Sequence, residues 1–347
     1  MGASRKLRVV QVGCGGRAQP HIAAMLESGA VDLVGVCDLD ERRLKATADK
    51  FGIANRSSDM AEMIRSTEPE LVDIVTPPTL RAAIVEPAIA AGAPALLIEK
   101  PIALTPSEMR RLVELGQDRL IAVNTQYQWI PHWQRIWQLL REQQFGEIRL
   151  IRASTGCNIL EQGPHILDLA LKAATIAGLP APEWVLAACA GREYFGDIPV
   201  PADTVATIGL GDARLHLNAG PSAPPVPRET EFWFQHQVEL IGSRGRAWVS
   251  CNQGWQLWFD GGFEAGATGW PRNDGEAQRA LFTDLRDTLH KQADAWRAFP
   301  THIQAAARNA DVMFGCYASA LEGARVGLGQ QWPDSIVEGR KMLAPGE

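Results

Sequence analysis

A glycine-rich turn near the amino terminus has the residue types that bind a dinucleotide. Gly13, Gly15 and Ala18 fit the G-x-G-x-x-G/A pattern, after an apolar run and before a helical pattern. The first glycine would make the turn, the second would let a pyrophosphate approach the backbone, and the alanine would let the helix pack on the strand. Gly16 and Arg17 complete the turn, where a helix N-terminus offers N–H groups to phosphate. A purely structural turn stays open, because any tight strand-to-helix turn uses glycine.

Asp38 supplies the second part of this predicted site. It follows an apolar run, Val31–Val36, and lies roughly 20–25 residues after the first glycine. A carboxylate there can accept hydrogen bonds from the adenosine ribose, and it repels the 2′-phosphate of NADP. The sequence therefore favours NAD over NADP. Arg42 and Arg43 are close enough to weaken this preference, although we favour solvated helix charges for both.

Lys100 and His165 have side chains that can assist the oxidation of a secondary alcohol. This reaction needs a base for the hydroxyl proton and a group that stabilises the developing alkoxide. His165 can be the base, because imidazole titrates near neutral pH. Lys100, followed by Pro101, can act as a cation or proton relay beside the oxygen. From the residues alone, a surface lysine before a turn and a histidine that only caps or packs remain alternatives.

Alternating strands and helices must position these residues. The strands predicted in the first third of the chain are continuous apolar runs, which are typical of a parallel sheet covered by helices on both faces. Ligands bind beyond the carboxyl ends of such strands. Positions at or just after predicted strand ends are therefore the predicted cofactor-binding positions, namely Gly13, Asp38, Thr76, Pro77, Pro78, Glu99, Lys100 and Asn124.

The pattern changes after Asn124. Helices are predicted over 131–143 and 164–177, then successive strands with short Gly-containing turns, including one over 231–241, and helices again over 276–298 and 301–325. Such strands favour a largely antiparallel sheet. We therefore predict an α/β chain with two domains. Residues 1–124 form a Rossmann domain with a doubly wound parallel sheet, and residues 125–347 form a second α/β domain.

The composition argues against several classes of protein. The 347 residues carry a net charge of −6 without a basic block, so we expect no nucleic-acid partner. No apolar run reaches the roughly 20 residues of a membrane span, and the charged N-terminus lacks a signal-peptide pattern. The six cysteines form no C-x-x-C motif, so we expect buried thiols in a cytoplasmic protein, and no metal site.

Several motifs, taken in order, resemble the family of glucose-fructose oxidoreductase, inositol dehydrogenase and rhizopine-catabolism oxidoreductases. They are Thr76-Pro77-Pro78, Glu99-Lys100-Pro101, Gly146-Glu147-Ile148, the segment 163–168 and the segment 238–245. The resemblance covers essentially the whole chain. It implies an NAD(P)-dependent oxidoreductase whose second domain binds substrate and carries a large open sheet. The open face usually makes the contact of a homodimer or homotetramer, and the substrates are commonly sugars, cyclitols or related polyols.

The resemblance also implies the catalytic residues. Members of this family use the lysine of the E-K-P motif with an aspartate and a histidine four residues apart, and here Lys100 and His165 match the lysine and the histidine. The aspartate position holds Glu161, a longer homologue. Arg81 stands where the pattern T-P-P-x-x-H often has histidine. Both departures make the transfer of roles from known members less direct.

Five further residues are candidate substrate contacts. Asp168 lies three residues after the histidine, where it could orient the imidazole or bind substrate, a solvated acid being the alternative. Gln126 and Trp129 follow the last Rossmann strand, and the indole could stack on the apolar face of a sugar. Arg152 and Asn158, on the next strand and loop, complete the set.

The favoured function is hydride transfer between a nicotinamide cofactor and a secondary alcohol of a sugar, cyclitol or polyol. One alternative is an enzyme that retains NAD and recycles it internally while converting a sugar. Another is a non-catalytic regulator that binds nucleotide or sugar and controls a partner protein. The presence of Lys100 and His165 argues against the regulator, which need not keep them.

Overall fold

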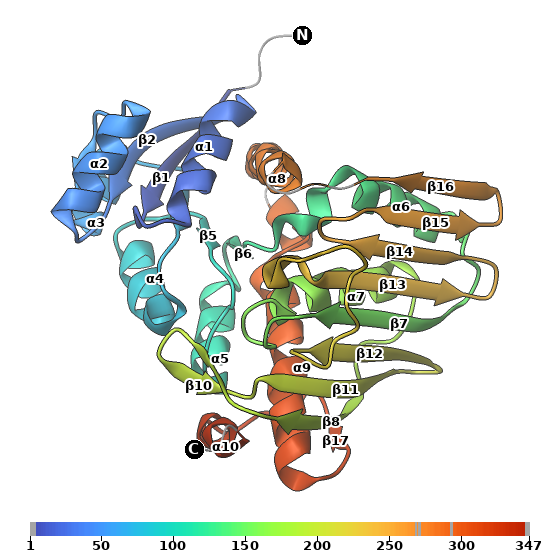
Figure 1. The fold of residues 1–347 in the computed structure, drawn as a ribbon. Coiled ribbons are helices and arrows are strands. Elements are labelled where there is room, and N and C mark those ends of the chain that lie inside the picture. Colours follow the sequence, from blue (N-terminus) through green and yellow to red (C-terminus); the bar gives the residue numbers. More distant parts are fainter. Residues whose placement is uncertain (1–4, 268, 270–271, 292–293, 344–347) are drawn as a thin grey trace. The chain divides into compact units, whose positions relative to one another are not determined.

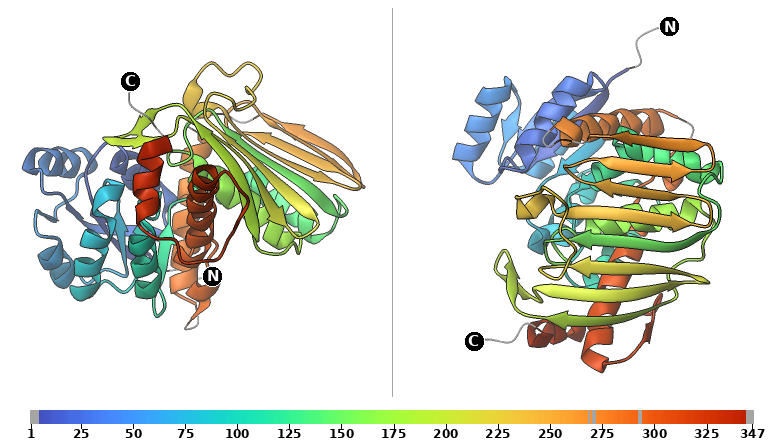
Figure 2. Two further views of the ribbon diagram at one scale, coloured as in Figure 1. Left: turned by 90° about the horizontal axis from the view of Figure 1, so that it is seen from below. Right: turned by 45° about the vertical axis from the view of Figure 1, so that its right-hand side comes forward.

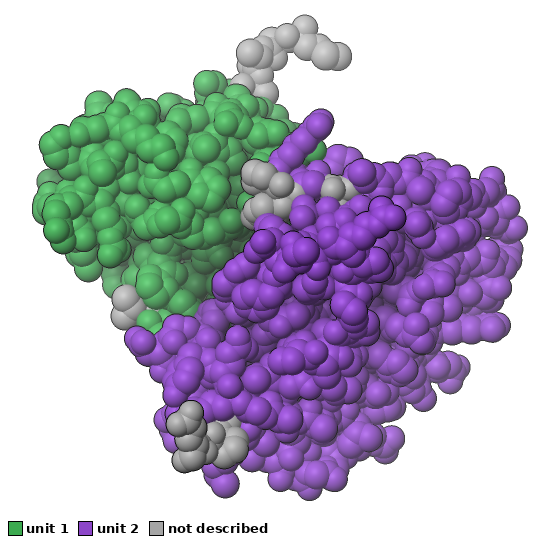
Figure 3. Space-filling model, in the orientation of Figure 1, with its two compact units in different colours: residues 1–104, 108–129, 274–307 green, residues 105–107, 130–273, 308–347 purple. Residues whose placement is uncertain are grey.

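The chain divides into two compact units in a computed structural model that describes residues 5–267, 269, 272–291 and 294–343. The first unit contains residues 1–104, 108–129 and 274–307, and the second contains 105–107, 130–273 and 308–347 (Figure 3). The main change of unit falls at 129–130, close to the predicted boundary at 124–125. A single boundary does not describe this division, because 274–307 returns to the first unit.

A six-stranded parallel sheet forms the centre of the first unit (Figure 1). Its strands are β1 (Leu7–Val12), β2 (Val31–Cys37), β3 (Arg56–Ser57), β4 (Leu71–Ile74), β5 (Leu96–Ile98) and β6 (Ile121–Val123). Their order is β3-β2-β1-β4-β5-β6, and all neighbouring pairs are parallel. This is the doubly wound order of a dinucleotide-binding sheet, so the predicted fold class is confirmed.

Helices follow these strands, and aspartate side chains cap two of them, α2 and α3. The helices packed with the sheet are α1 (Ala18–Ser28), α2 (Glu41–Phe51), α3 (Met60–Thr67), α4 (Arg81–Ala90), α5 (Pro106–Leu115) and α8 (Arg272–Leu289), with short 3₁₀ turns η1 (Pro78–Leu80), η2 (Gln126–Trp129) and η4 (Ala295–Ala298). Asp40 caps α2 by accepting from the backbone N–H groups of Arg42 and Arg43. A side-chain cap of this kind typically stabilises a helix by about 1 kcal/mol.

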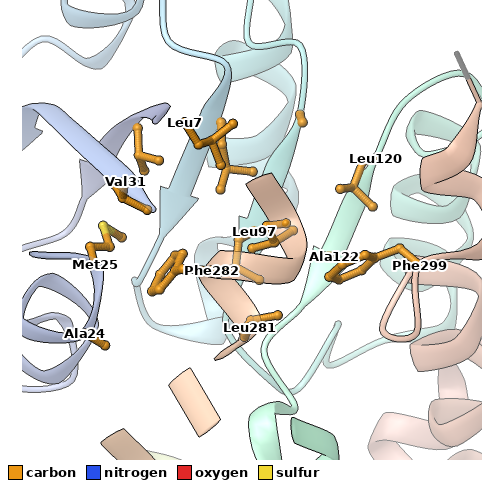
Figure 4. Packing of buried hydrophobic residues seen from close by; sticks show 14 residues of the cluster. Leu7, Ala24, Met25, Val31, Leu97, Leu120, Ala122, Leu281, Phe282 and Phe299 are labelled. Atoms are coloured by element: carbon orange, nitrogen blue, oxygen red, sulfur yellow. The ribbon is translucent and has the colours of Figure 1, made fainter. Parts of the chain in front are cut away.

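The core of the first unit joins its strands to α8. Leu7 and Leu97 from the sheet belong to one buried cluster with Leu281 and Phe282 from α8, and all four are 0% exposed (Figure 4). Burying a side chain of this size contributes roughly 1.5–3 kcal/mol. A helix far along the sequence therefore belongs to the first unit.

The predicted helix over 276–298 is wrong at its carboxyl end. The structure ends α8 at Leu289 and forms the separate 3₁₀ turn η4. Asp294, before this turn, has a φ of 70°, a left-handed conformation that a continuous α-helix does not contain. The apolar pattern continued through the break, so periodicity alone did not locate it.

The second unit contains a nine-stranded sheet, seen broadside in Figure 2. Its strands are β7 (Ile148–Thr155), β8 (Trp184–Ala190), β11 (Asp203–Leu210), β12 (Ala213–Ala219), β13 (His236–Gly242), β14 (Arg246–Ser250), β15 (Trp255–Phe259), β16 (Gly262–Gly266) and β17 (Val326–Gly327). The order is β16-β15-β14-β13-β7-β12-β11-β8-β17, with only β7 and β12 parallel. The prediction of a largely antiparallel sheet is confirmed. The predicted strand 231–241 begins later, because η3 (Phe232–Phe234) occupies its start.

Helices cover one face of this sheet and leave the other exposed. The remaining elements are α6 (Pro131–Arg141), α7 (Gly163–Ile176), α9 (Ile303–Glu322), α10 (Ser335–Leu343) and the hairpin of β9 (Glu193–Phe195) and β10 (Ile198–Val200). α7 packs on β7 and β13. Ile151 and Ala153 of β7 are buried, whereas Arg152 between them is exposed. This alternation separates a helix-covered face from an outer face.

Three sequence expectations concern whole-chain properties. The structure describes all six cysteines and joins none of them in a disulfide, and four are buried and two partly buried. Over the described ranges, no helix combines the length and apolarity that a membrane crossing needs. Within the same ranges, no group of three or more His, Cys, Asp or Glu side chains is arranged to hold a metal ion. The cytoplasmic location stays a prediction.

Candidate functional site

The glycine turn has the geometry of a dinucleotide cradle. Gly13 has a φ of 94°, and a Cβ there would lie 2.2 Å from the carbonyl oxygen of Val75, so no larger residue fits. A Cβ at Gly15 or Gly16 would meet no heavy atom within 4 Å. The turn thus packs tightly against the end of β4 on one side and is open at its next two glycines, as close approach of a pyrophosphate requires.

Asp38 is fixed beside this turn at the carboxyl end of β2. Its Oδ2 accepts a 2.6 Å hydrogen bond from the backbone N–H of Cys14, and its Oδ1 accepts one of 2.8 Å from Asp40. Arg42 and Arg43 have side chains 94% and 62% exposed and lie near Asp40 instead. They are solvated charges at the start of α2, as the sequence favoured.

Glu99 joins three other side chains at the strand ends. Its Oε1 accepts from Nδ2 of Asn124 at 2.8 Å and Nε of Arg17 at 3.3 Å, and lies 3.0 Å from Nε2 of His21. Its Oε2 accepts from the backbone N–H of Lys100 at 3.2 Å. Burial opposes ionisation, but the hydrogen bond with His21 and the charge of Arg17 hold the pKa of Glu99 well below its usual range. Glu99 is thus ionised, and it contacts residues at the start of α1, after β5 and after β6.

Two members of this cluster, His21 and Asp73, were missed in the sequence. Nδ1 of His21 lies 2.8 Å from Oδ2 of Asp73, and both residues are buried. Burial opposes the charged imidazole, but the charge of Asp73 and the hydrogen bonds to both carboxylates raise the pKa of His21 to about 9. One sequence signal could have revealed them. Asp73 interrupts a fully buried apolar strand, where a carboxylate needs a partner.

Asp274 of α8 is a third missed residue. Its Oδ2 lies 3.3 Å from Nη1 of Arg17, and its Oδ1 accepts from Nε2 of Gln126. Burial opposes the charged guanidinium, but the charges of Glu99 and Asp274 raise the pKa of Arg17 above its ordinary value. The glycine turn is therefore tied to a helix more than two hundred residues away in sequence, and no local pattern indicates that contact.

Arg81, the residue that departs from the family pattern, is completely buried after η1. Its Nη1 donates to the carbonyl of Thr76 at 3.4 Å, so it closes the segment Thr76-Pro77-Pro78 at the end of β4. Burial lowers the pKa of Arg81 to about 10, against the opposing charges of Glu99 and Glu108. The positive charge of Arg81 therefore interacts with the carboxylate of Glu99.

The remaining predicted catalytic residues, Glu161 and His165, lie close to the start of α7 in the second unit. His165 lies in the first turn of this helix and is 4% exposed. Asp168 is 5% exposed and accepts from Nδ2 of Asn309 at 3.3 Å, so it is not a solvated acid. Asn158 accepts from the backbone N–H of Glu161 at 3.0 Å and donates to Glu193 at 3.1 Å. Asn158 thus shapes the loop that leads to His165.

Trp129 and Arg152, two candidate substrate contacts, interact with other side chains of the protein. The indole N–H of Trp129 donates to Asp284 at 3.1 Å, and its ring lies 5.7 Å from that of Phe299, within the core of the first unit. Arg152 lies 3.1 Å from Glu239 on the outer face of the large sheet. These contacts are those of packing and sheet-surface residues.

A doubly wound sheet with this glycine turn and carboxylate defines a dinucleotide-binding Rossmann unit. Residues 7–125 match a family described as "Oxidoreductase family, NAD-binding Rossmann fold". This match confirms, over the amino-terminal part of the chain, the family resemblance that the motifs predicted, and the matched family binds NAD. The glycine turn and Asp38 are the residues that would hold it.

Similar proteins include two D-apiose dehydrogenases. That of Rhizobium rhizogenes is 29% identical over 73% of this chain and 75% of its own length, and that of Paraburkholderia graminis is 29% identical over 41% and 38%. An inositol 2-dehydrogenase of Corynebacterium glutamicum is 25% identical over 75% and 78%. A crystal structure of an oxidoreductase from Agrobacterium radiobacter with NAD+, L-tartaric acid and magnesium matches 93% of this chain and 98% of its own, with a TM-score of 0.77 and 20% identity. This last likeness shows a shared fold.

Proposed function

We propose that this NAD-dependent oxidoreductase is a dehydrogenase that oxidises a secondary hydroxyl of a sugar, cyclitol or related polyol. The observation that carries the proposal is the arrangement in the first unit, where an open glycine turn, the fixed Asp38 and the Glu99–Lys100 segment all lie at strand ends. The apiose and inositol dehydrogenases among the similar proteins support this substrate class. NAD is preferred over NADP in this proposal.

Lys100, His165 and Glu161 carry the chemistry in this proposal. Bound NAD would accept the hydride from the substrate carbon. His165 would take the hydroxyl proton, and the Lys100 ammonium would stabilise the alkoxide as negative charge develops. Glu161 would take the place of the family aspartate beside the histidine. The mechanism requires the lysine amine and the imidazole to meet at one reacting carbon.

The substrate contacts proposed from sequence differ in their support. Asp168 and Asn158 are buried polar residues in the same unit as His165, so we propose both as the main substrate-side contacts. Gln126, Trp129 and Arg152 remain secondary proposals, because the first two contact carboxylates of α8 in the first unit and Arg152 contacts Glu239 on the outer sheet face.

The outer face of the large sheet is the proposed contact of a homodimer or homotetramer. Leu186 of β8 and Val205 of β11 are 49% and 41% exposed on this face. Arg152, Glu239 and Arg246 form ion pairs on the same face, on β7, β13 and β14. A broad face that mixes exposed apolar and paired charged side chains is typical of an interface between copies.

The test is NAD reduction with a panel of polyols that includes D-apiose and myo-inositol, followed by the absorbance of the reduced cofactor. Lys100→Met and His165→Ala should each lower kcat at least about a hundredfold, as loss of a catalytic acid–base group does. Lys45→Met on the surface of α2 and His290→Ala, whose imidazole contacts Glu70, are matched controls that should keep the wild-type kcat. Turnover that survives both catalytic substitutions contradicts the proposed roles.

Two other outcomes identify the competing functions. Sugar conversion without added NAD, by protein purified with bound nucleotide, would indicate internal recycling. Nucleotide binding without hydride transfer in a single turnover would indicate a regulator.

A further inference from the structure

A histidine outside the proposed catalytic set lies between two carboxylates of the first unit. His21 is 1% exposed, with Nδ1 2.8 Å from Oδ2 of Asp73 and Nε2 3.0 Å from Oε1 of Glu99. A neutral imidazole has only one N–H, so its second nitrogen would present a lone pair to a carboxylate oxygen. Only the doubly protonated ring donates to both partners.

The polar groups that face His21 come from three adjacent strands. Asp73 lies within β4, and Glu99 follows β5. Asn124, after β6, has its Nδ2 2.9 Å from Nε2 of His21 and donates to the same Glu99 oxygen. A neutral ring that accepts from this amide is the competing arrangement, and it would leave Nε2 against Glu99 without a proton.

The remaining neighbours are cations and an apolar wall. Arg17, one turn earlier, contacts Glu99 and Asp274 of α8. Arg81 on α4 acts on Glu99 through its charge. From α8, the ring of Phe282 lies edge-on to the imidazole at 6.3 Å. Water is excluded from both sides of His21, so its charge is neutralised by the two carboxylates rather than by solvent.

Glu99 transmits the position of His21 to the proposed catalytic lysine. One oxygen of Glu99 contacts the imidazole, and the other accepts from the backbone N–H of Lys100. A shift of this carboxylate therefore shifts the segment that carries the amine. Misplacement of a catalytic group by about 1 Å can cost a hundredfold in rate.

We propose that His21 is a positioning residue, a doubly protonated imidazole that joins Asp73 to Glu99 and thereby fixes the Lys100 segment at the strand ends. The proposal rests on the proposed role of Lys100 in alcohol oxidation. His21 itself touches neither substrate nor the reacting atoms in this account.

The charge of His21 is tested by unfolding, which needs no turnover. The full chain is unfolded in denaturant between pH 6 and pH 10 as wild type, His21→Gln and Asp73→Asn. The pKa of His21 is about 9 in the folded chain and near 6.5 in the unfolded chain. Its contribution to the free energy of unfolding is therefore complete below pH 6.5 and is lost as pH rises through 9, a change that we call the alkaline loss. His21→Gln should abolish this alkaline loss, and Asp73→Asn should move it about one pH unit or more downward. An alkaline loss unchanged in both variants overturns the proposal.

His290→Gln is the matched control. His290 also lies in the first unit and also contacts a carboxylate, Glu70 at 3.1 Å, but neither residue contacts the His21 cluster. Its substitution should leave the alkaline loss in place. If His290→Gln removes the loss and His21→Gln keeps it, the assignment is overturned.

Positioning is tested by separating kcat from KM. Folded His21→Gln should lose about 10- to 100-fold in kcat, with the KM for NAD within about threefold of wild type. Asp73→Asn should shift the alkaline limb of the kcat–pH profile downward, which a purely structural role would not do. An unchanged kcat in folded His21→Gln overturns the positioning role. A wild-type chain that oxidises no polyol overturns the proposed function instead. In that case a crystal structure of His21→Gln tests the positioning role. A Glu99–Lys100 segment in its wild-type position would overturn that role.

Discussion

The carboxylate of Asp38 holds the backbone of the glycine turn, and we propose that it also binds the adenosine ribose. One oxygen accepts from Cys14 in the turn and the other from Asp40. Its charge, rather than its size, should decide between the two nicotinamide cofactors.

Asp38→Asn should therefore relax cofactor choice. The amide keeps an oxygen acceptor but loses the repulsion of a 2′-phosphate, so the ratio of kcat/KM for NAD over NADP should fall about tenfold, or roughly 1.4 kcal/mol. Steady-state kinetics with both cofactors measures it. Asp40→Asn removes the same charge two residues away, where it caps α2, and should change the ratio less than twofold. An equal effect of both substitutions would contradict the role of Asp38.

At the residue scale, the sequence predicted the parts of the site that have a local pattern. Gly13, Asp38 and the Glu99–Lys100 pair all fall at the ends of predicted strands, and the structure has strands ending there. His21 and Asp73 were not found, because their partners lie on other elements and no spacing in the sequence joins them. Arg81 was noted as a departure, but its complete burial depends on packing that the motif does not encode.

At the element scale, α8 acts on the glycine turn although it belongs to a late part of the chain. Asp274 near its first turn contacts Arg17 and Gln126, while Asp284, further along the same helix, accepts from Trp129. Two carboxylates of one helix thus have comparable polar contacts, but only Asp274 contacts a residue of the glycine turn, Arg17.

Asp274→Asn should weaken NAD binding because it removes the charge that fixes Arg17. We expect the Kd for NAD, measured by calorimetry, to rise about tenfold. The free energy of unfolding should fall by about 1–3 kcal/mol, the usual cost when a buried polar contact is lost. Asp284→Asn should cost similar stability and leave the Kd within about twofold. Equal Kd values for NAD in both variants would contradict the role of Asp274 in fixing Arg17.

Element boundaries were predictable where the chain carries a cap or a breaker. Such signals mark the starts of α2 and α5, because Asp40 caps the first and Pro106 begins the second. α3 was missed, although Asp59 caps it by accepting from Glu62. The two residues of β3 were too short for any periodicity.

At the scale of the whole molecule, one row of side chains crosses the outer face of the large sheet. Register pairs Leu186 with Thr207, then His216, Arg152, Glu239 and Trp248 across six strands. The row is polar at its middle and apolar at its ends, and Val205 lies on the same face two residues from Thr207 along β11. The sequence could indicate these strands but not which of their faces α7 would cover.

Val205→Lys should disrupt the proposed assembly. A charge placed within an interface must be desolvated without a partner, which favours dissociation. Light scattering should show a smaller mass at micromolar concentration, with unchanged NAD binding by the separated chains. Leu26→Lys, at a comparably exposed apolar position on α1, is the control and should keep the wild-type mass. A monomeric wild type would contradict the proposal directly.

The return of 274–307 to the first unit has a consequence for how the protein is made. On the ribosome, the strands that carry Leu7 and Leu97 emerge early, but the helix with Leu281 and Phe282 that covers them emerges only after 130–273 has been synthesised. At about 5–20 residues per second this delay is roughly 7–30 s. During that interval the nascent sheet exposes an apolar face, which makes it a client for chaperones that bind such surfaces before translation is complete.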